Sequence, residues 1–468
     1  MNDRELALEL LDYIQQGPTP FHVVARTARV LEQAGFTQLD ERDAWKLRAG
    51  DKRYVARNGS SLIAFAVGSS PPEQGGFCIV GAHTDSPCLK LKPNAAGSRH
   101  GYRQLGVEPY GGLLLSTWLD RDLGLAGRVL VGCHGTIEPR TFLVHVDRPW
   151  LRIPNVAIHL NREVNTKGLI LDQQQHMPPI LGMASDAPES IGDLRQLLAR
   201  LLAEQQDQNV DASDILDFDL TLVDTHRGAL GGADEEFLFS ARIDNLASCH
   251  GALSGLCRSV AGLAKAPTTR MIALWDNEEC GSRSMQGAQG PFLRQVLERI
   301  VEARSPNAPQ AAARAIASSF LISSDMAHAI HPNYADRHEP QHAPELGKGP
   351  VLKYNANQSY ASDGESAARF AAACKASGFE PQRFVVRSDM PCGSTIGPIT
   401  AALTGIKTVD VGNPMLSMHS IREMASVRDH ARMTSVLTVL FNGVASASVA
   451  PTKPLRPPTT KAKAVVKA

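Results

Sequence analysis

The sequence lacks the features that mark several large classes of protein. None of its apolar runs approaches the roughly 20 residues needed to span a bilayer. The N-terminal stretch MNDRELALELLDYIQQG carries Asp3, Glu5 and Glu9 among its leucines, which is typical of an amphipathic helix and not of a signal peptide. No internal repeat is found. The sequence therefore predicts a protein that neither spans a membrane nor is secreted.

Surplus charge and paired cysteines are missing as well. Forty-eight Lys and Arg residues balance 48 Asp and Glu residues, so no net field favours nucleic acid or an anionic membrane. The eight cysteines are scattered without a CxxC pair, which is typical of reduced thiols and not of a disulfide framework. We expect a cytoplasmic protein that binds neither nucleic acid nor membrane.

What is present is an alternation of strand and helix patterns in an ordinary globular composition. Of the 468 residues, 43% are hydrophobic and 21% are charged, which is sufficient for more than one domain. Apolar strand patterns such as GGFCIVGAHTD, RMIALWD, ASSFLISSD and IKTVDV alternate with helical patterns, the last of which is REMASVRDHARMTSVLTVLFNGV. RYVARNGSSLIAFAVG reads as a hairpin that turns at Asn58-Gly59. This alternation predicts a three-layer α/β/α sandwich.

A central segment interrupts this rhythm. It is rich in Gly and Pro and in short alternating strands such as TFLVHVDRPW and DFDLTLVDTH, with one helix at SIGDLRQLLARLLAEQQ. We predict a catalytic domain in two parts, an inserted β-rich domain between them and a disordered Pro/Thr/Lys-rich tail, with boundaries at 1–93, 94–232, 233–450 and 451–468.

Polar residues follow the predicted strands of the catalytic domain, where open α/β sheets gather their ligands. They are His83, Asp85, Asp244, the pair Glu278 and Glu279, Asp325 and His419. Two histidines and several carboxylates form an N/O ligand set that suits Zn²⁺, Mn²⁺ or Co²⁺. The carboxylates are too many for one catalytic zinc, but two metals that share a carboxylate would use them all.

The glutamate pair in WDNEECGS has a particular interpretation. Successive side chains of a strand point to opposite faces, so Glu278 and Glu279 are expected to point in different directions. One could then bind a cation while the other moves a proton. Each residue also has a plainer explanation. A Glu-Glu pair is usually a solvated helix face, and Asp244 before a helix is usually an N-cap. Only the coincidence of all these residues at strand ends favours a metal site.

Seven motifs resemble the aspartyl aminopeptidase family of dinuclear zinc exopeptidases, the M18 family: GAHTDSPCLKLKP, RIDNLASC, DNEECGS, SSDMAHAIHPNY, GPVLKYNANQSYAS, MPCGSTIGPI and GNPMLSMHSIREM. The resemblance runs from PTPFHV to the final helix. Cys280 and the basic tail after Pro451 depart from the family pattern, and neither coincides with a metal ligand of that pattern.

The resemblance implies roles for individual residues. Asp244 would bridge two zinc ions, one completed by His83 and Asp325 and the other by Glu279 and His419. Glu278 would be the general base, and Asp85 would orient the imidazole of His83. The family pattern also implies substrate contacts by His159, His328, Lys353 and Tyr360, with His159 reaching the active site of a neighbouring subunit.

The resemblance also implies a substrate and an assembly. The substrates would be peptides with a free N-terminal acidic residue, with Lys353 as our candidate to read the acidic side chain. The assembly would be a dodecamer built from dimers. Without the resemblance, Lys353 reads as a solvated lysine on a strand and His159 as a polar residue on a strand of the insertion. Two other interpretations are a metallo-aminopeptidase of the same fold that prefers neutral residues, and a catalytically silent scaffold.

Overall fold

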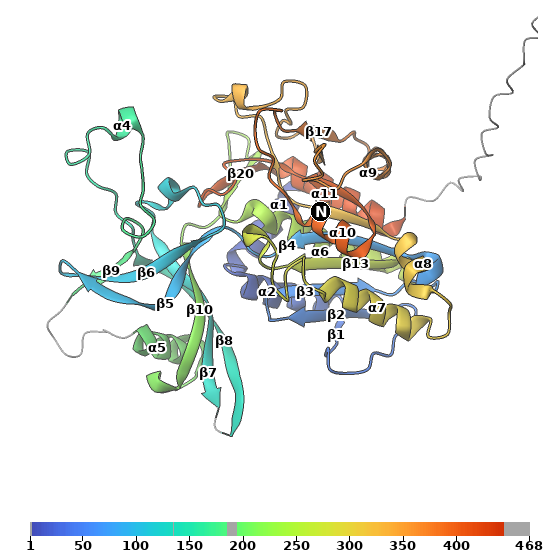
Figure 1. The fold of residues 1–468 in the computed structure, drawn as a ribbon, viewed down its shortest axis with the longest axis horizontal. Helices are drawn as coiled ribbons and strands as arrows, with labels where there is room; N and C mark the ends of the chain where they lie inside the picture. The colour runs from blue at the N-terminus through green and yellow to red at the C-terminus, as the bar shows by residue number, and fades with distance from the viewer. Residues whose placement is uncertain (1, 134, 185–193, 444–468) are drawn as a thin grey trace, which may run out of the picture.

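The computed structural model describes residues 2–133, 135–184 and 194–443. Figure 1 shows two bodies of secondary structure, an α/β sandwich and a β-rich part beside it, with the most C-terminal described helix in the sandwich. The predicted tail, 451–468, lies outside the described residues.

A nine-stranded mixed sheet forms the middle layer of the sandwich. Its four central strands run parallel, so that their carboxyl ends meet at one edge. In spatial order the strands are β1 (Thr37–Gln38), β2 (Lys52–Arg57), β3 (Ser61–Ala66), β13 (Thr269–Trp275), β4 (Phe77–His83), β14 (Phe320–Ser324), β18 (Lys407–Gly412), β16 (Val351–Tyr354) and β17 (Gln382–Val385).

Helices cover both faces of this sheet because its central strands are apolar on both sides. In β4, Val80 and Ala82 pack into one core and Phe77 and Ile79 into another. The first core is covered by α1 (Asp3–Gln16), α2 (Pro20–Gln33), α6 (Ile243–Ser259), α9 (Gly364–Ala376) and α11 (Val427–Asn442). The second is covered by α7 (Phe292–Arg304), α8 (Ala311–Ala317) and α10 (Ile396–Thr404). The predicted three-layer sandwich is confirmed.

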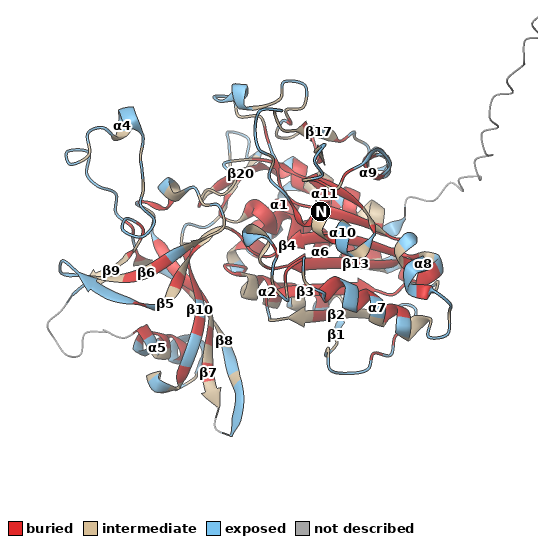
Figure 2. Cartoon of the chain, viewed as in Figure 1, coloured by how far each residue is buried: buried red, intermediate tan, exposed pale blue. Residues whose placement is uncertain are grey.

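The β-rich part is a six-stranded sheet with its own hydrophobic core. Its strands, in spatial order, are β8 (Thr136–Leu151), β7 (Leu123–Cys133), β10 (Ile215–Asp224), β5 (Cys88–Arg99), β6 (Tyr102–Tyr110) and β9 (Ile180–Met183). Helix α5 (Leu194–Gln206) packs on this sheet through Leu198, Leu201 and Leu202. Figure 2 shows buried residues along β10, partly buried ones at the end of β7 and exposed ones at the start of β8. The division of the chain into the four predicted segments stays a prediction.

A five-stranded sheet of short strands completes the sheet structure. It consists of β11 (Ala229–Gly231), β12 (Phe237–Ser240), β20 (Glu423–Ser426), β19 (Pro414–Leu416) and β15 (Ala327–His328). The remaining helical turns are α3 (Pro72–Gly75), α4 (Val164–Lys167), η1 (Leu115–Trp118), η2 (Ala212–Asp214), η3 (Val260–Lys265), η4 (Glu278–Cys280) and η5 (Ala335–Arg337). None of the helices in the described ranges is both long and apolar enough to cross a membrane.

Most local predictions agree with the structure. The hairpin of β2 and β3 turns at Asn58-Gly59, both with positive φ. The segments TFLVHVDRPW and DFDLTLVDTH fall in β8 and β10. The prediction for the closing helix is partly wrong. The helix begins at Val427, because the preceding residues Glu423–Ser426 pair with β12 and β19 as strand β20. The helix predicted from Ser190 is described from Leu194 onward.

Candidate metal centre and active site

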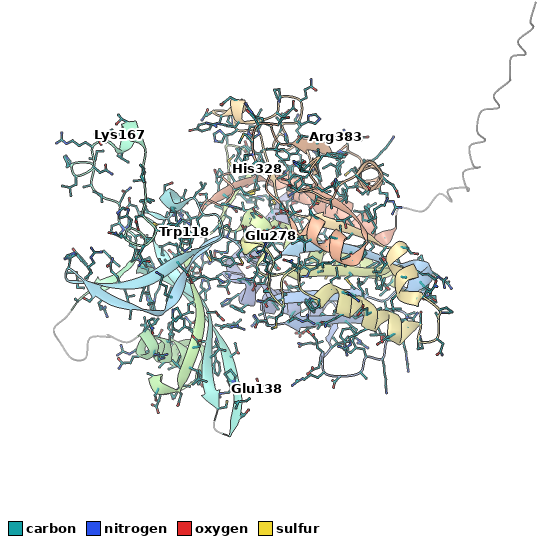
Figure 3. All side chains as sticks on the ribbon, viewed as in Figure 1. Trp118, Glu138, Lys167, Glu278, His328 and Arg383 are labelled. Atoms are coloured by element: carbon teal, nitrogen blue, oxygen red, sulfur yellow. The ribbon has the colours of Figure 1, made fainter. Side chains whose placement is uncertain are left out.

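Parallel neighbouring strands bring most of the predicted site residues together. His83 ends β4, Asp325 follows β14, and Glu278 and Glu279 follow β13 after a short turn. Asp244 lies at the start of α6, at a position whose backbone is not helical. His419 comes from the loop after β19. Figure 3 shows Glu278 at the junction of the α/β sandwich and the six-stranded sheet.

The two carboxylate oxygens of Asp244 face two different groups of side chains. On one side, His83 Nε2 lies 3.5 Å from Asp244 Oδ1 and 3.4 Å from Asp325 Oδ1. On the other side, His419 Nε2 lies 3.6 Å from Asp244 Oδ2 and 3.5 Å from Glu279 Oε2. These distances exceed those of good hydrogen bonds. Two ligands of one tetrahedral Zn²⁺, each about 2.0–2.2 Å from the ion, are separated by roughly 3.3–3.6 Å, so the spacing matches metal coordination.

The side chains fit a cation in a second respect. Asp244 Oδ1 and Glu279 Oε1 are buried and have no hydrogen-bond partner in the described structure. Burying a carboxylate oxygen without a partner is costly, and a divalent cation would supply that partner. The ligand atoms of His83, Asp244 and Glu279 all lie within 4.8 Å of one another. This N/O donor set suits zinc and its close relatives.

Both imidazoles are oriented by backbone carbonyl groups. His83 Nδ1 lies 3.0 Å from the carbonyl oxygen of Asp85, and His419 Nδ1 lies 2.9 Å from that of Gly112. Since a carbonyl oxygen can only accept, each Nδ1 carries a proton and donates it. Nε2 of each ring is the nitrogen that faces Asp244, and it offers a metal ion its lone pair once it has lost its own proton.

The carboxylates hold unusual pKa values because they are buried close together. Burial raises the pKa of Glu278 to about 8, and the negative charges of Asp325 and Asp85 act in the same direction. Burial and the neighbouring Asp244 raise the pKa of Glu279 well above its ordinary value. Burial lowers the pKa of His83, but the carboxylates of Asp244, Asp325 and Asp85 raise it by more. The pKa of His83 therefore lies well above its ordinary value. The site therefore holds protons tightly, and a bound cation would displace them.

A cavity of about 430 Å³ opens over these residues and contains three of the four predicted substrate contacts. His328 is exposed to it, Tyr360 is buried in its wall, and Lys353 is only 2% exposed. Lys353 Nζ donates to the carbonyl of Met326 (2.8 Å) and lies 3.5 Å from Asp325 Oδ2. The plainer interpretation of Lys353 as a solvated lysine is thus wrong. It is the one Lys or Arg among the described residues that line this cavity.

The fourth predicted contact lies elsewhere. His159 is exposed in the loop that leads to α4, and this loop extends away from the nine-stranded sheet in Figure 1. His159 is not among the described residues that line the cavity. Within one chain, the structure therefore does not bring His159 together with the other predicted residues.

Two further sequence expectations need correction. Glu278 and Glu279 are not on a strand: Asn277 adopts a left-handed conformation, and both glutamates lie in the 3₁₀ turn η4 with their side chains in the same cavity wall. Asp244 does not behave as an ordinary N-cap: its backbone and that of Asn245 are not helical, and its Oδ1 accepts no hydrogen bond in the described structure. Glu423 was missed by sequence reasoning. It is 3% exposed, and its two oxygens accept the backbone N–H groups of Asp244 (3.0 Å) and His419 (2.8 Å).

Comparison with known proteins identifies the family of this chain. The sequence model described as "Peptidase_M18: Aminopeptidase I zinc metalloprotease (M18)" matches residues 13–441. The chain belongs to the M18 family of aminopeptidases. It is 47% identical over 437 residues to "Probable M18 family aminopeptidase 2" of Pseudomonas paraeruginosa, covering 93% of this chain and 98% of the relative. A protein of the same description from Azotobacter vinelandii is 47% identical over 438 residues, covering 94% and 98%.

Solved structures agree with the assignment. A chain in the cryo-EM structure of the Ape4 and Nbr1 complex has a TM-score of 0.90 at 40% identity, covering 94% of this chain and 86% of that one. A chain of the S. cerevesiae mApe1 dodecamer has a TM-score of 0.82 at 31% identity, covering 94% and 97%. This M18 chain is therefore a metallo-aminopeptidase of a zinc family.

Proposed function

We propose that this M18 aminopeptidase removes N-terminal Asp and Glu residues from peptides with a free amino terminus, and that it uses two zinc ions. One ion would be held by His83 and Asp325, the other by Glu279 and His419, and Asp244 would bridge them. Mn²⁺ and Co²⁺ suit the same donors. The observation that carries the proposal is the position of Asp244 between the two groups of ligands. Its Oδ1 faces His83 on the side of Asp325, and its Oδ2 faces His419 on the side of Glu279.

In this proposal Glu278 moves protons. Bound zinc supplies Lewis-acid chemistry that polarises the peptide carbonyl and activates water. Glu278 Oε2 lies 4.0 Å from His83 Nε2, farther than the proposed ligands, and its side chain lines the cavity. Its carboxylate accepts the proton of the attacking water and returns a proton to the leaving amine. Asp85 fixes the turn that carries both glutamates, because its carboxylate accepts the backbone N–H groups of Glu278 (3.2 Å) and Glu279 (3.0 Å).

The charges that line the cavity bear on the substrate preference. The cavity is lined by the carboxylates of Asp244, Glu278, Glu279 and Asp325, which also offer partners for the free α-amino group of a substrate. Two bound Zn²⁺ ions would balance the charge of these carboxylates, so an acidic substrate side chain buried in the cavity needs a further cation as its partner. Lys353 is the lining side chain that can provide it, and its burial strengthens the interaction.

A panel of aminoacyl chromogenic substrates tests this preference. We expect the wild-type enzyme to prefer Asp and Glu over Ala. Lys353→Met, which keeps the volume of the side chain, should reduce kcat/KM for Asp- and Glu-substrates by about 30-fold or more relative to Ala, roughly 2 kcal/mol. The exposed Lys348 provides the control variant Lys348→Met. An equal loss on every substrate would mean that Lys353 does not read the side chain, and a wild-type preference for Ala would favour the neutral-residue alternative.

We also propose a homo-oligomer, with a dodecamer built from dimers as its form. The similarity to the S. cerevesiae mApe1 dodecamer supports it, as does the exposed position of His159 on a loop directed away from its own nine-stranded sheet. In this arrangement His159 contacts the substrate in the neighbouring subunit. A cytoplasmic location is part of the same proposal, supported by eight cysteines that are all free thiols.

Complementation tests the role of His159. Subunits with His159→Ala and subunits with Glu278→Gln, each inactive alone, are mixed under conditions that permit exchange. One active site of a mixed dimer then contains its own Glu278 and the partner's His159, so activity should return in part. If mixed particles form and activity does not return, His159 acts within its own subunit or has no role.

A further inference from the structure

The chain leaves the nine-stranded sheet after β4, and it passes the same place again after two strands of the six-stranded sheet. β4 ends at His83, and β5 begins at Cys88, so that Asp85 lies in the connection between the two sheets. β6 then brings the chain back, and its last residue, Tyr110, pairs with Cys88. The two residues after Tyr110 are Gly111 and Gly112, which lie beside the proposed metal ligands.

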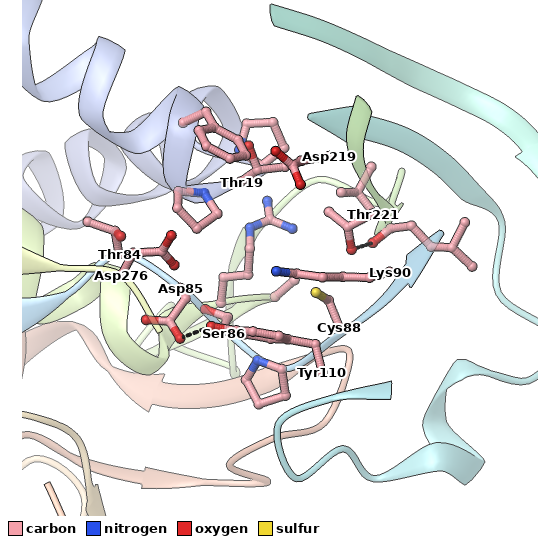
Figure 4. A pocket seen from close by; sticks show the side chains of 18 of the residues that line it. Thr19, Thr84, Asp85, Ser86, Cys88, Lys90, Tyr110, Asp219, Thr221 and Asp276 are labelled. Atoms are coloured by element: carbon pink, nitrogen blue, oxygen red, sulfur yellow. Dashed lines mark hydrogen bonds between the residues drawn. The ribbon is translucent and has the colours of Figure 1, made fainter. Parts of the chain in front are cut away.

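Tyr110 holds Asp85 by a short hydrogen bond. Its hydroxyl donates to Asp85 Oδ2 at 2.6 Å and accepts from Asn277 Nδ2 at 3.1 Å. Burial raises the pKa of Tyr110, and the charge of Asp85 raises it further, so the phenol keeps the proton that it donates. Lys90 Nζ lies 3.9 Å from the centre of the Tyr110 ring. Figure 4 shows Tyr110, Lys90 and Asp85 together in the wall of a cavity between the two sheets.

Gly111 and Gly112 lie beside the other half of the proposed metal site, which contains Glu279 and His419. The carbonyl of Gly112 accepts the Nδ1 proton of His419 at 2.9 Å, and Leu114 N donates to the His419 carbonyl at 3.0 Å. Gly111 has a φ of +73°, and a Cβ added there would lie 3.0 Å from Glu279 Cβ. The backbone conformation at 111 and the close approach to Glu279 therefore both favour glycine there.

We propose that Tyr110-Gly111-Gly112 is a positioning segment through which the six-stranded sheet sets the geometry of both halves of the metal site. Tyr110 acts on the His83 half through Asp85, whose backbone carbonyl orients the imidazole. Gly111 and Gly112 act on the His419 half, through Glu279 and through the His419 ring. The inference rests on the proposed two-metal site and adds residues that are not themselves ligands.

The first test measures Co²⁺ binding to the metal-free enzyme from its visible absorption, comparing wild type, Tyr110→Phe and Tyr102→Phe. Tyr102 is at the opposite end of the same strand and is 41% exposed, so it undergoes the same chemical change away from the site. Loss of such an outer hydrogen bond typically weakens metal affinity by about 10- to 100-fold. We expect that loss, with an altered spectrum, in Tyr110→Phe, where it should be larger for the ion held by His83 than for the other, and we expect no loss for either ion in Tyr102→Phe.

The second test addresses the other half with Gly111→Ala and Gly101→Ala. Gly101 has a φ of +81° and no neighbouring atom within 4 Å of an added Cβ, so it carries the same backbone strain without the contact. We expect Gly111→Ala to weaken the other Co²⁺ ion about tenfold or more, and Gly101→Ala to leave both affinities unchanged. The melting temperature of each metal-free variant shows how much of any effect is general destabilisation.

The outcomes separate this inference from the proposed function. If the wild-type enzyme does not bind two Co²⁺ ions, the two-metal proposal fails and the positioning role fails with it. If the wild type binds two ions but Tyr110→Phe keeps the wild-type affinity and spectrum, the metal site stands and the role of Tyr110 is overturned. Equal losses in Gly111→Ala and Gly101→Ala would overturn the role of Gly111 in the same way.

Discussion

Replacing Glu278 by glutamine tests the division of labour between the adjacent glutamates. Glu278 Oε2 is 4.0 Å from His83 Nε2, whereas the proposed ligand Glu279 has Oε2 3.5 Å from His419 Nε2. Glu278 also keeps a 15% exposed side chain in the cavity wall, while the side chain of Glu279 is 5% exposed. Glutamine keeps the shape of the side chain but removes its charge and its ability to accept a proton from water.

The expected size of the effect follows from the proposed role. A positioned acid–base group contributes about 10²- to 10⁴-fold to a rate, which corresponds to roughly 2.7–5.4 kcal/mol of the activation barrier. Glu278→Gln should lower kcat by that factor. Its zinc content should stay near that of the wild type, because none of the five proposed ligands is changed.

The assay combines kcat on an aminoacyl substrate with zinc content per subunit after dialysis. Glu279→Gln is the matched control, since it makes the same chemical change one residue along the chain. We expect it to lose zinc from the His419 half, because it removes a buried ligand. If Glu278→Gln loses zinc, or keeps kcat within tenfold of the wild type, the assignment of Glu278 as the proton-transfer group is wrong.

Two further predictions concern the bridging ligand and pH. Asp244→Ala should lose both ions, because each half of the site faces one of its oxygens; retention of one ion at wild-type affinity in metal analysis would refute the bridge. Glu278 (pKa about 8) and Glu279 are protonated more readily in the folded, metal-free protein than in the unfolded chain, so their contribution to stability declines as pH rises from about 4.5 through 8. Since zinc displaces these protons, the increase in melting temperature on adding zinc should be larger at pH 8 than at pH 6, and an equal increase at both would contradict it.

The residues that sequence reasoning located are those whose signal is local. His83 and Asp325 each follow an apolar strand, and parallel strands of one sheet necessarily end at the same edge. The turn at Asn58-Gly59 is likewise decided by two neighbouring residues. The metal-ligand assignments themselves came from the family resemblance, and their roles stay predictions.

The residues that sequence reasoning misplaced depend on contacts between distant segments. Glu423 stands next to a strongly periodic helix, and only its pairing with β12 and β19 makes it part of a strand. Lys353 is polar and reads as exposed, yet Met326 and Asp325 from another strand end cover its ammonium group. Tyr110 has no local signal, because its partner Asp85 lies 25 residues earlier in the chain, before the first strand of the six-stranded sheet. Nonlocal contacts of this kind leave no periodic pattern.

The same nonlocal contacts explain why the candidate ligands have the spacing of a metal site. Each histidine is fixed by a backbone carbonyl at its Nδ1, His83 by Asp85 and His419 by Gly112. Glu423 accepts the backbone N–H groups of both Asp244 and His419, so it fixes the proposed bridge relative to one of its partners. Asp85 in turn holds the backbone of the turn that carries Glu278 and Glu279. The protein's own hydrogen bonds thus set the distances between the ligand atoms, and they come from Asp85 after β4, from Gly112 after β6 and from Glu423 in β20. A perturbation of the six-stranded sheet near Tyr110 should therefore reach the metal centre without altering any ligand.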